Sequence, residues 1–133
     1  MTDDRITAAV ACGGTGGHMY PGMALARALR ERGARVHVVI GRRGVEQRSL
    51  LPDCCDAVHT IPCRGFSGRA LSWGTLRAAS SLGLAALRSA RLLRAIRCRV
   101  VIGMGSYSMV GPATAARFLG IPLVLHEGNA QPG

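Results

Sequence analysis

The residues of this 133-residue chain that could do chemistry follow apolar runs, and the first group is a glycine-rich loop. The apolar run 6–12 leads into Gly13-Gly14-Thr15-Gly16-Gly17-His18. Glycines leave backbone N–H groups unshielded, and the start of a helix carries partial positive charge, so this loop would stabilise a phosphate or a diphosphate. The alternative is that the glycines only allow a tight turn between a strand and a helix.

His18 and Glu127 are the candidate catalytic residues. His18 ends the glycine loop, where an imidazole could accept a proton from a sugar hydroxyl near neutral pH; the alternative is a histidine at a helix start that bonds to backbone. Glu127 is the only acidic residue after Asp56, in a span that holds nine arginines. It could activate a hydroxyl as a base, or it could pair with an arginine and organise its loop.

A second and a third loop carry further candidate binding residues. Gly103-Met104-Gly105-Ser106 follows another apolar run and could hold a phosphate in the same way, or serve only as a turn. Tyr107 and Asn129 could hydrogen-bond a sugar, although either could also serve a turn, and His126 precedes Glu127 directly. His37 and His59 fall within predicted strands, where we expect them to fill core or surface positions.

The elements that must position these loops alternate between strand and helix patterns. A helix with Pro21 in its first turn ends at Gly33, and Gly120 ends the last helix. The predicted strands are 6–12, 35–40, 57–62, 100–103 and 122–126, the other predicted helices are 45–51, 73–97 and 112–119, and 64–69 is loop-like. This alternation predicts a Rossmann-like α/β fold, a parallel sheet with helices on both faces. The three candidate loops would then meet at the carboxyl edge of the sheet, where such folds bind ligands.

The strand and the glycine loop also raise the possibility of dinucleotide binding, which the spacing argues against. A G-x-G-x-x-G motif started at Gly14 needs glycine at position 19, which is Met19, and no acidic residue ends the second strand to hold a ribose. Arg42 and Arg43 could instead meet a 2′-phosphate, so an NADP-binding domain is the lesser alternative. We otherwise expect no cofactor.

Composition restricts the partners further. The net charge is +10, and all seventeen basic residues are arginine, which favours phosphate groups or anionic lipid as partners. Two Phe, two Tyr and one Trp are too few for base stacking, so we expect no nucleic acid. Five cysteines without C-x-x-C spacing indicate neither a disulfide framework nor a metal site, and fit a reducing cytoplasm. No stretch approaches the ~20 apolar residues of a spanning helix, so any membrane contact would be peripheral.

The predicted long helix has two different faces. Ala78, Leu82, Ala86, Leu93 and Ile96 share one face, which should pack on the sheet. The other face and the residues before it interleave apolar side chains with arginines, which suits the headgroup boundary of an anionic bilayer. The alternative is a solvated basic face whose leucines contact another domain. The candidate membrane patch is Leu71, Trp73, Leu76, Arg77, Leu84, Leu87, Arg88, Arg91 and Arg94.

Four motifs in order resemble a known family. They are Gly13–His18 with Pro21-Gly22, Gly103–Tyr107 with Gly111-Pro112, Gly120-Ile121-Pro122, and His126-Glu127-Gly128-Asn129. Over essentially the whole chain this pattern is similar to the N-terminal domain of the peptidoglycan N-acetylglucosaminyltransferases, GT-B enzymes of glycosyltransferase family 28. The resemblance implies inverting transfer of N-acetylglucosamine from UDP-N-acetylglucosamine to undecaprenyl-diphospho-muramoyl-pentapeptide.

The resemblance also implies roles for the parts of this chain. Residues 1–133 would be the acceptor-binding domain, at the cytoplasmic face of the cell membrane, while the donor-binding C-terminal domain is absent. His18 would be the base or an acceptor contact, with Tyr107, His126, Glu127 and Asn129 lining the acceptor side of the cleft. We therefore expect the isolated chain to be inactive. The alternative is a non-catalytic, membrane-associated acceptor-binding subunit that needs a separate donor-binding chain.

Overall fold

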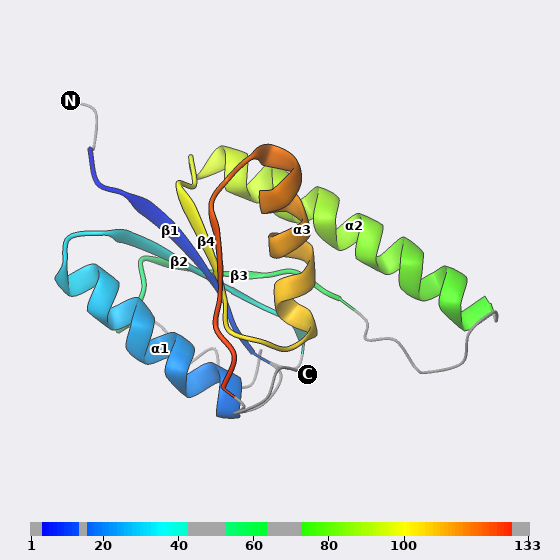
Figure 1. The fold of residues 1–133 in the computed structure, drawn as a ribbon, viewed down its shortest axis with the longest axis horizontal. Helices are drawn as coiled ribbons and strands as arrows, with labels where there is room; N and C mark the ends of the chain where they lie inside the picture. Colours follow the sequence, from blue (N-terminus) through cyan, green and yellow to red (C-terminus); the bar gives the residue numbers. More distant parts are fainter. Residues whose placement is uncertain (1–3, 14–15, 43–52, 64–72, 129–133) are drawn as a thin grey trace.

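The computed structural model describes residues 4–13, 16–42, 53–63 and 73–128. Figure 1 shows helices between successive strands of the chain, except that β3 is the next described element after β2. The elements are β1 (Thr7–Ala11), α1 (Gly16–Glu31), β2 (Arg35–Ile40), β3 (Ala57–Thr60), α2 (Trp73–Ala95), β4 (Val100–Gly103), the 3₁₀ turn η2 (Tyr107–Met109), α3 (Val110–Leu119) and β5 (Leu123–Leu125). The predicted helix 45–51 and the predicted loop 64–69 lie outside the described residues.

The five strands form one parallel sheet in the order β3-β2-β1-β4-β5. From β1 the chain first builds outward through β2 and β3, then crosses over to add β4 and β5 on the other side. The strand order therefore reverses between β1 and β4, which is where open α/β sheets bind ligands. The predicted Rossmann-like fold is confirmed.

The central strand β1 is buried on both faces, which explains the apolar run 8–11 that follows Thr7. On one face Val10 packs with Val36 and Val38 of β2 and with residues of α1. On the other face Ala9 packs with Leu93 of α2 and with two alanines of α3. Helices thus cover both faces of the sheet, α1 on one and the α2–α3 pair on the other (Figure 1).

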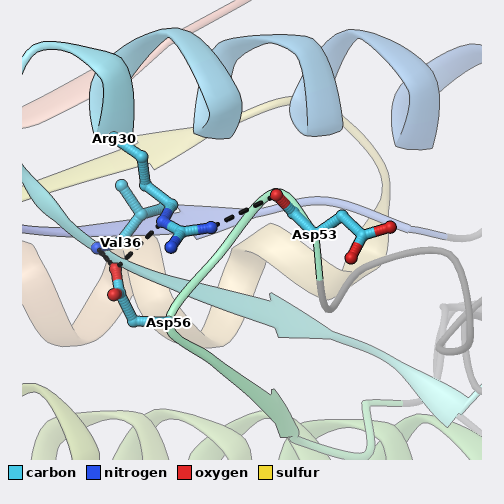
Figure 2. A network of polar contacts seen from close by, with 4 residues as sticks. All are labelled: Arg30, Val36, Asp53 and Asp56. Carbon is cyan, nitrogen blue, oxygen red and sulfur yellow. Dashed lines mark hydrogen bonds and ion pairs between the residues drawn. The ribbon is translucent and has the colours of Figure 1, made fainter.

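A polar contact ties the end of α1 to the start of two strands (Figure 2). The Asp56 carboxylate accepts a hydrogen bond of 2.7 Å from the Val36 N–H and lies 3.7 Å from Nε of Arg30. Arg30 also donates to the Asp53 carbonyl at 3.2 Å. These contacts fix the turn before β3 against α1, and Asp56 is thereby balanced by a cation from the helix.

The strand predictions hold closely, whereas two helix starts were predicted wrongly. The strands at 35–40 and 100–103 are confirmed to the residue. Those predicted at 6–12, 57–62 and 122–126 are shorter, at Thr7–Ala11, Ala57–Thr60 and Leu123–Leu125. Helix α1 begins at Gly16, so Pro21 lies inside it rather than in its first turn. Helix α3 begins at Val110 because η2 runs directly into it, and Pro112 still falls in the first turn, where its missing N–H costs nothing.

The helix ends follow the predicted glycine signals. Gly33 and Gly120 have φ of +85° and +67°, the left-handed conformation that closes a helix. Helix α2 ends at Ala95 rather than 97, and Arg97 takes the left-handed position with φ +52°.

The buried face of α2 differs from the predicted one by part of a turn. Ala78 and Leu93 are buried as expected, but the most buried positions between them are Ala85 and Ser89, each 1% exposed, while Leu82 and Ala86 are only half-buried. The cause is helix α3, which approaches through Gly111. A Cβ at Gly111 would lie 3.0 Å from Ser89 Oγ and 3.1 Å from the Ala85 carbonyl oxygen, which is tighter than an ordinary contact, so glycine eases this approach.

Candidate functional site

Backbone hydrogen bonds bring the three candidate loops together at the carboxyl edge of the sheet. The Met104 N–H donates to the Ala11 carbonyl at 2.9 Å, and the His126 N–H donates to the Gly103 carbonyl at 2.8 Å. The loops after β1, β4 and β5 therefore begin side by side. This edge is the one predicted to hold the site.

The first loop turns from β1 into α1 at Gly13. Gly13 has φ +135°, a conformation that side-chain-bearing residues rarely adopt, and a Cβ there would lie 3.6 Å from Ser108 Oγ. Gly22 in α1 lies so close to Cys12 that a Cβ would come within 2.7 Å of the Cys12 Cβ. The start of α1 is thus held at the end of β1, with its N-terminal N–H groups at the ligand edge. Gly14 and Thr15 lie outside the described residues.

His18, in the first turn of α1, joins the first loop to the second. Its Nδ1 lies 2.9 Å from the carbonyl oxygen of Met104, 86 residues away in the chain. A Cβ at Gly105 would lie 2.7 Å from the same Nδ1, so the ring occupies the space that a side chain at position 105 would need. His18 is therefore bonded to backbone, as the alternative interpretation expected. The backbone group belongs to Met104 in the second loop.

The second loop contains two serines in contact. Ser106 has φ +71° and ψ 165°, and its Oγ lies 2.7 Å from Ser108 Oγ. Ser108 is buried, and its side chain lies in contact range of Gly13. Sequence reasoning singled out Ser106 but missed Ser108, whose only sequence signal is its place two residues further along the same loop. Tyr107, between them, is exposed.

The third loop places His126 and Glu127 on the surface directly after β5. Asn129 lies outside the described residues. Of the sequence-predicted site residues, the structure thus brings His18 against Gly105, while Gly13 lies beside Ser108 of the same second loop. His126 joins them through its backbone bond to Gly103.

Comparison with known proteins now decides the family. The model of the glycosyltransferase family 28 N-terminal domain matches residues 8–133. The chain belongs to glycosyltransferase family 28.

Curated relatives of this family 28 domain agree. The chain is 42% identical over 125 residues to the UDP-N-acetylglucosamine–N-acetylmuramyl-(pentapeptide) pyrophosphoryl-undecaprenol N-acetylglucosamine transferase of Acidithiobacillus ferrooxidans, covering 93% of this chain and 34% of the relative. It is 45% identical over 134 residues to the transferase of the same name from Halorhodospira halophila, covering 96% of this chain and 35% of that protein. The chain therefore spans about a third of the length of these relatives.

A solved structure supports the same assignment. The crystal structure of MurG from Acinetobacter baumannii superposes with a TM-score of 0.78 at 30% identity, covering 97% of this chain and 37% of that one. The match to a GT-B glycosyltransferase confirms the expected fold.

Burial raises the pKa of all five cysteines of the family 28 domain, each of which lies in the described part of the chain. Burial, reinforced by Cys54 and Cys55, raises the pKa of Cys12 to about 12, so this thiol beneath the first loop stays protonated. Burial likewise raises the pKa of Cys55 to about 11. Among the described residues no group of three His, Cys, Asp or Glu side chains could hold a metal ion.

The family 28 domain carries a second polar cluster near the opposite edge of the sheet, which sequence analysis did not foresee. His37 and His59 were expected only to fill core or surface positions. In the structure Nδ1 of His37 lies 2.9 Å from Nε2 of His59, and their rings stack with centroids 5.2 Å apart. Burial lowers the pKa of His37, His59 and Arg35 lower it further, and Asp56 opposes them. An open depression of about 560 Å³ beside the pair is lined by Arg35, His37, Asp56, Ala95, Ile96 and Arg97.

The outer face of α2 carries the predicted mixture of apolar and basic side chains. Trp73 is 84% exposed and Leu76 66%, and Leu84 and Leu87 are about half exposed. The four arginines of the candidate patch on this helix, Arg77, Arg88, Arg91 and Arg94, are exposed as well, and Leu71 lies outside the described residues. Phe118 of α3, 85% exposed, was missed by sequence analysis. No helix in the described ranges is long and apolar enough to cross a bilayer.

Proposed function

We propose that this family 28 domain is the acceptor-binding half of an inverting hexosaminyltransferase. The reaction is transfer of N-acetylglucosamine from UDP-N-acetylglucosamine to the 4-hydroxyl of the muramoyl sugar in undecaprenyl-diphospho-muramoyl-pentapeptide. The observation that carries this proposal is the contact of His18 with Met104, which joins two glycine loops at the N-terminus of α1. The names of the curated relatives supply the substrates.

The acceptor diphosphate would lie against the first loop. Backbone N–H groups at the start of α1 and the partial positive charge of that helix end stabilise an anion there. Residues with side chains rarely adopt the φ of +135° at Gly13, so this position favours glycine, whose backbone is open to a phosphate group. Tyr107, His126, Glu127 and Asn129 would line the sugar side of the same site.

His18 would then act on the acceptor hydroxyl. The hydroxyl oxygen attacks the anomeric carbon of the donor, its proton passes to Nε2 of His18, and the bond from the anomeric carbon to the UDP oxygen breaks, releasing UDP. The donor must be held by residues outside this chain, either in a longer polypeptide or in a partner chain. The isolated chain is therefore inactive in this proposal.

The exposed face of α2 would hold the domain on the membrane that contains the acceptor. Leucines and Trp73 would enter the headgroup boundary, while the arginines would bind anionic lipid. In this proposal the domain lies peripherally at the cytoplasmic face of the membrane. The NADP alternative is not proposed, because the family is one of glycosyltransferases.

Turnover in a reconstituted enzyme tests the proposal. The chain is combined with the donor-binding domain of a MurG relative, and transfer from UDP-N-acetylglucosamine to a soluble acceptor analogue is measured. We expect turnover only from the combination, and a rate loss on the order of 10² or more in His18→Ala or Glu127→Ala if that residue is the base. Losses below threefold in both variants would reject a chemical role for either. Full acceptor binding without turnover in any combination would favour the non-catalytic subunit.

A further inference from the structure

Gly105 directly follows Met104 in the second loop and leaves no room for a side chain beside the His18 ring. A Cβ at position 105 would lie 2.7 Å from Nδ1 and 2.8 Å from Cε1 of His18. Real Cβ atoms do not come this close to another heavy atom, and the ring is held in place because the Met104 carbonyl bonds it. Any side chain at position 105 must therefore displace the imidazole.

The bond to Met104 also determines which ring nitrogen carries the proton. A carbonyl oxygen can only accept, so Nδ1 at 2.9 Å must donate. A neutral ring with its proton on Nε2 would place the Nδ1 lone pair against the carbonyl lone pairs. In the neutral imidazole, Nε2 is therefore the nitrogen left with a lone pair.

We propose that Gly105 is a positioning residue that, by lacking a side chain, lets the Met104 carbonyl reach His18 and fix the Nδ1–H tautomer. This inference rests on the proposed function for its purpose, because the tautomer matters to transfer only if Nε2 receives the acceptor proton. The hydrogen bond that fixes the tautomer is a property of the isolated chain. It can be measured whether or not the enzyme turns over.

Backbone conformation must be separated from contact with the ring. Gly105 has φ +88°, so alanine there is strained even without a neighbour. Gly33 offers a matched control, because its φ is +85° and a Cβ there would have nothing within 4 Å. Gly105→Ala and Gly33→Ala thus share the strain, and only Gly105→Ala meets His18.

The experiment is ¹⁵N NMR of the histidine side chains in the isolated chain, at a pH where His18 is neutral. We expect the Nδ1–H tautomer for His18 in the wild type and in Gly33→Ala, and a shift towards Nε2–H in Gly105→Ala. An Nε2–H tautomer in the wild type overturns the proposal even if Gly105→Ala does not fold. An unchanged tautomer in Gly105→Ala overturns it as well.

A kinetic arm distinguishes this proposal from the proposed function. In the reconstituted enzyme we expect Gly105→Ala to lower kcat about tenfold or more with little change in the KM for the donor, and Gly33→Ala to stay within about twofold. A tautomer shift in Gly105→Ala without loss of kcat would support the role of Gly105 in fixing the tautomer but reject His18 as the base. A loss of kcat in Gly105→Ala without a tautomer shift would reject the role of Gly105 in fixing the tautomer.

Discussion

Nδ1 of His37 and Nε2 of His59 lie 2.9 Å apart, so two neighbouring parallel strands are linked by a side-chain hydrogen bond on one face of the sheet. One ring must donate and the other must accept, which requires the accepting nitrogen to be unprotonated. The pair therefore couples the stability of β2 and β3 to pH.

The first prediction concerns that coupling. Burial, His59 and Arg35 lower the pKa of His37 below the ordinary 6.5, against the opposing effect of Asp56, so the unfolded chain binds a proton more readily than the folded one. The stabilisation is fully present above pH 6.5 and is lost as pH falls through the lower folded pKa. Urea unfolding of the wild type should show a falling midpoint from pH 7 towards pH 5, and His37→Gln should show a smaller fall. If the urea midpoints of the two proteins fell equally with pH, the pH dependence could not be assigned to His37.

The second prediction tests the close approach of α2 and α3. Gly111→Ala should lower the free energy of unfolding by about 1–3 kcal/mol, because its Cβ would meet Ser89 Oγ and the Ala85 carbonyl at 3.0–3.1 Å. Gly83→Ala is the control within α2, where a Cβ has nothing within 4 Å, and it should stabilise by about 0.5–1 kcal/mol. Urea midpoints that move in the same direction for both variants would rule out the packing argument.

The third prediction concerns Ser89 itself. Its hydroxyl is buried and has no hydrogen-bond partner among the described residues. Ser89→Ala should therefore raise the free energy of unfolding by about 1 kcal/mol, since it removes an unsatisfied buried group. Ser80→Ala is a useful comparison, because Ser80 is exposed and bonds to the Leu76 carbonyl at 2.9 Å. A loss of thermal stability in Ser89→Ala would mean that its hydroxyl has a partner after all.

The fourth prediction concerns the membrane face of α2. Arg88→Glu combined with Arg91→Glu should abolish sedimentation with anionic vesicles, because each basic residue near such a surface contributes about 1 kcal/mol. Arg27→Glu combined with Arg32→Glu changes the net charge equally, but in α1 and the turn directly after it, on the other face of the sheet, and should retain most binding. Equal binding of the wild type to neutral and anionic vesicles would remove the electrostatic part of the proposal.

Features of the fold could be predicted from the sequence where a short stretch of the chain carries the pattern that indicates them. The strands at 35–40 and 100–103 were predicted correctly because buried parallel strands are short apolar runs bounded by turns. Gly33 and Gly120 marked helix ends because the left-handed cap favours glycine. The carboxyl-edge position of the three loops then followed from the parallel topology.

Other features were missed because they depend on residues distant in the chain. The buried face of α2 is set by Gly111 of α3, which a helical wheel of α2 alone does not include. The His37–His59 pair depends on the register of β2 with β3, and the His18 bond joins residues 86 positions apart. No local pattern contains these contacts.

The most direct test of the central claim is where a diphosphate binds. The ¹⁵N-labelled chain is titrated with farnesyl diphosphate, and the backbone amide shifts are followed, with farnesol as the uncharged control. We expect the diphosphate, and not farnesol, to shift the amides of residues 13–18 and of Gly105, and His18→Ala to keep the loop shifts while losing those at Gly105. Diphosphate-dependent shifts that leave residues 13–18 unmoved, such as shifts confined to Arg35, His37 and Arg97, would contradict the account.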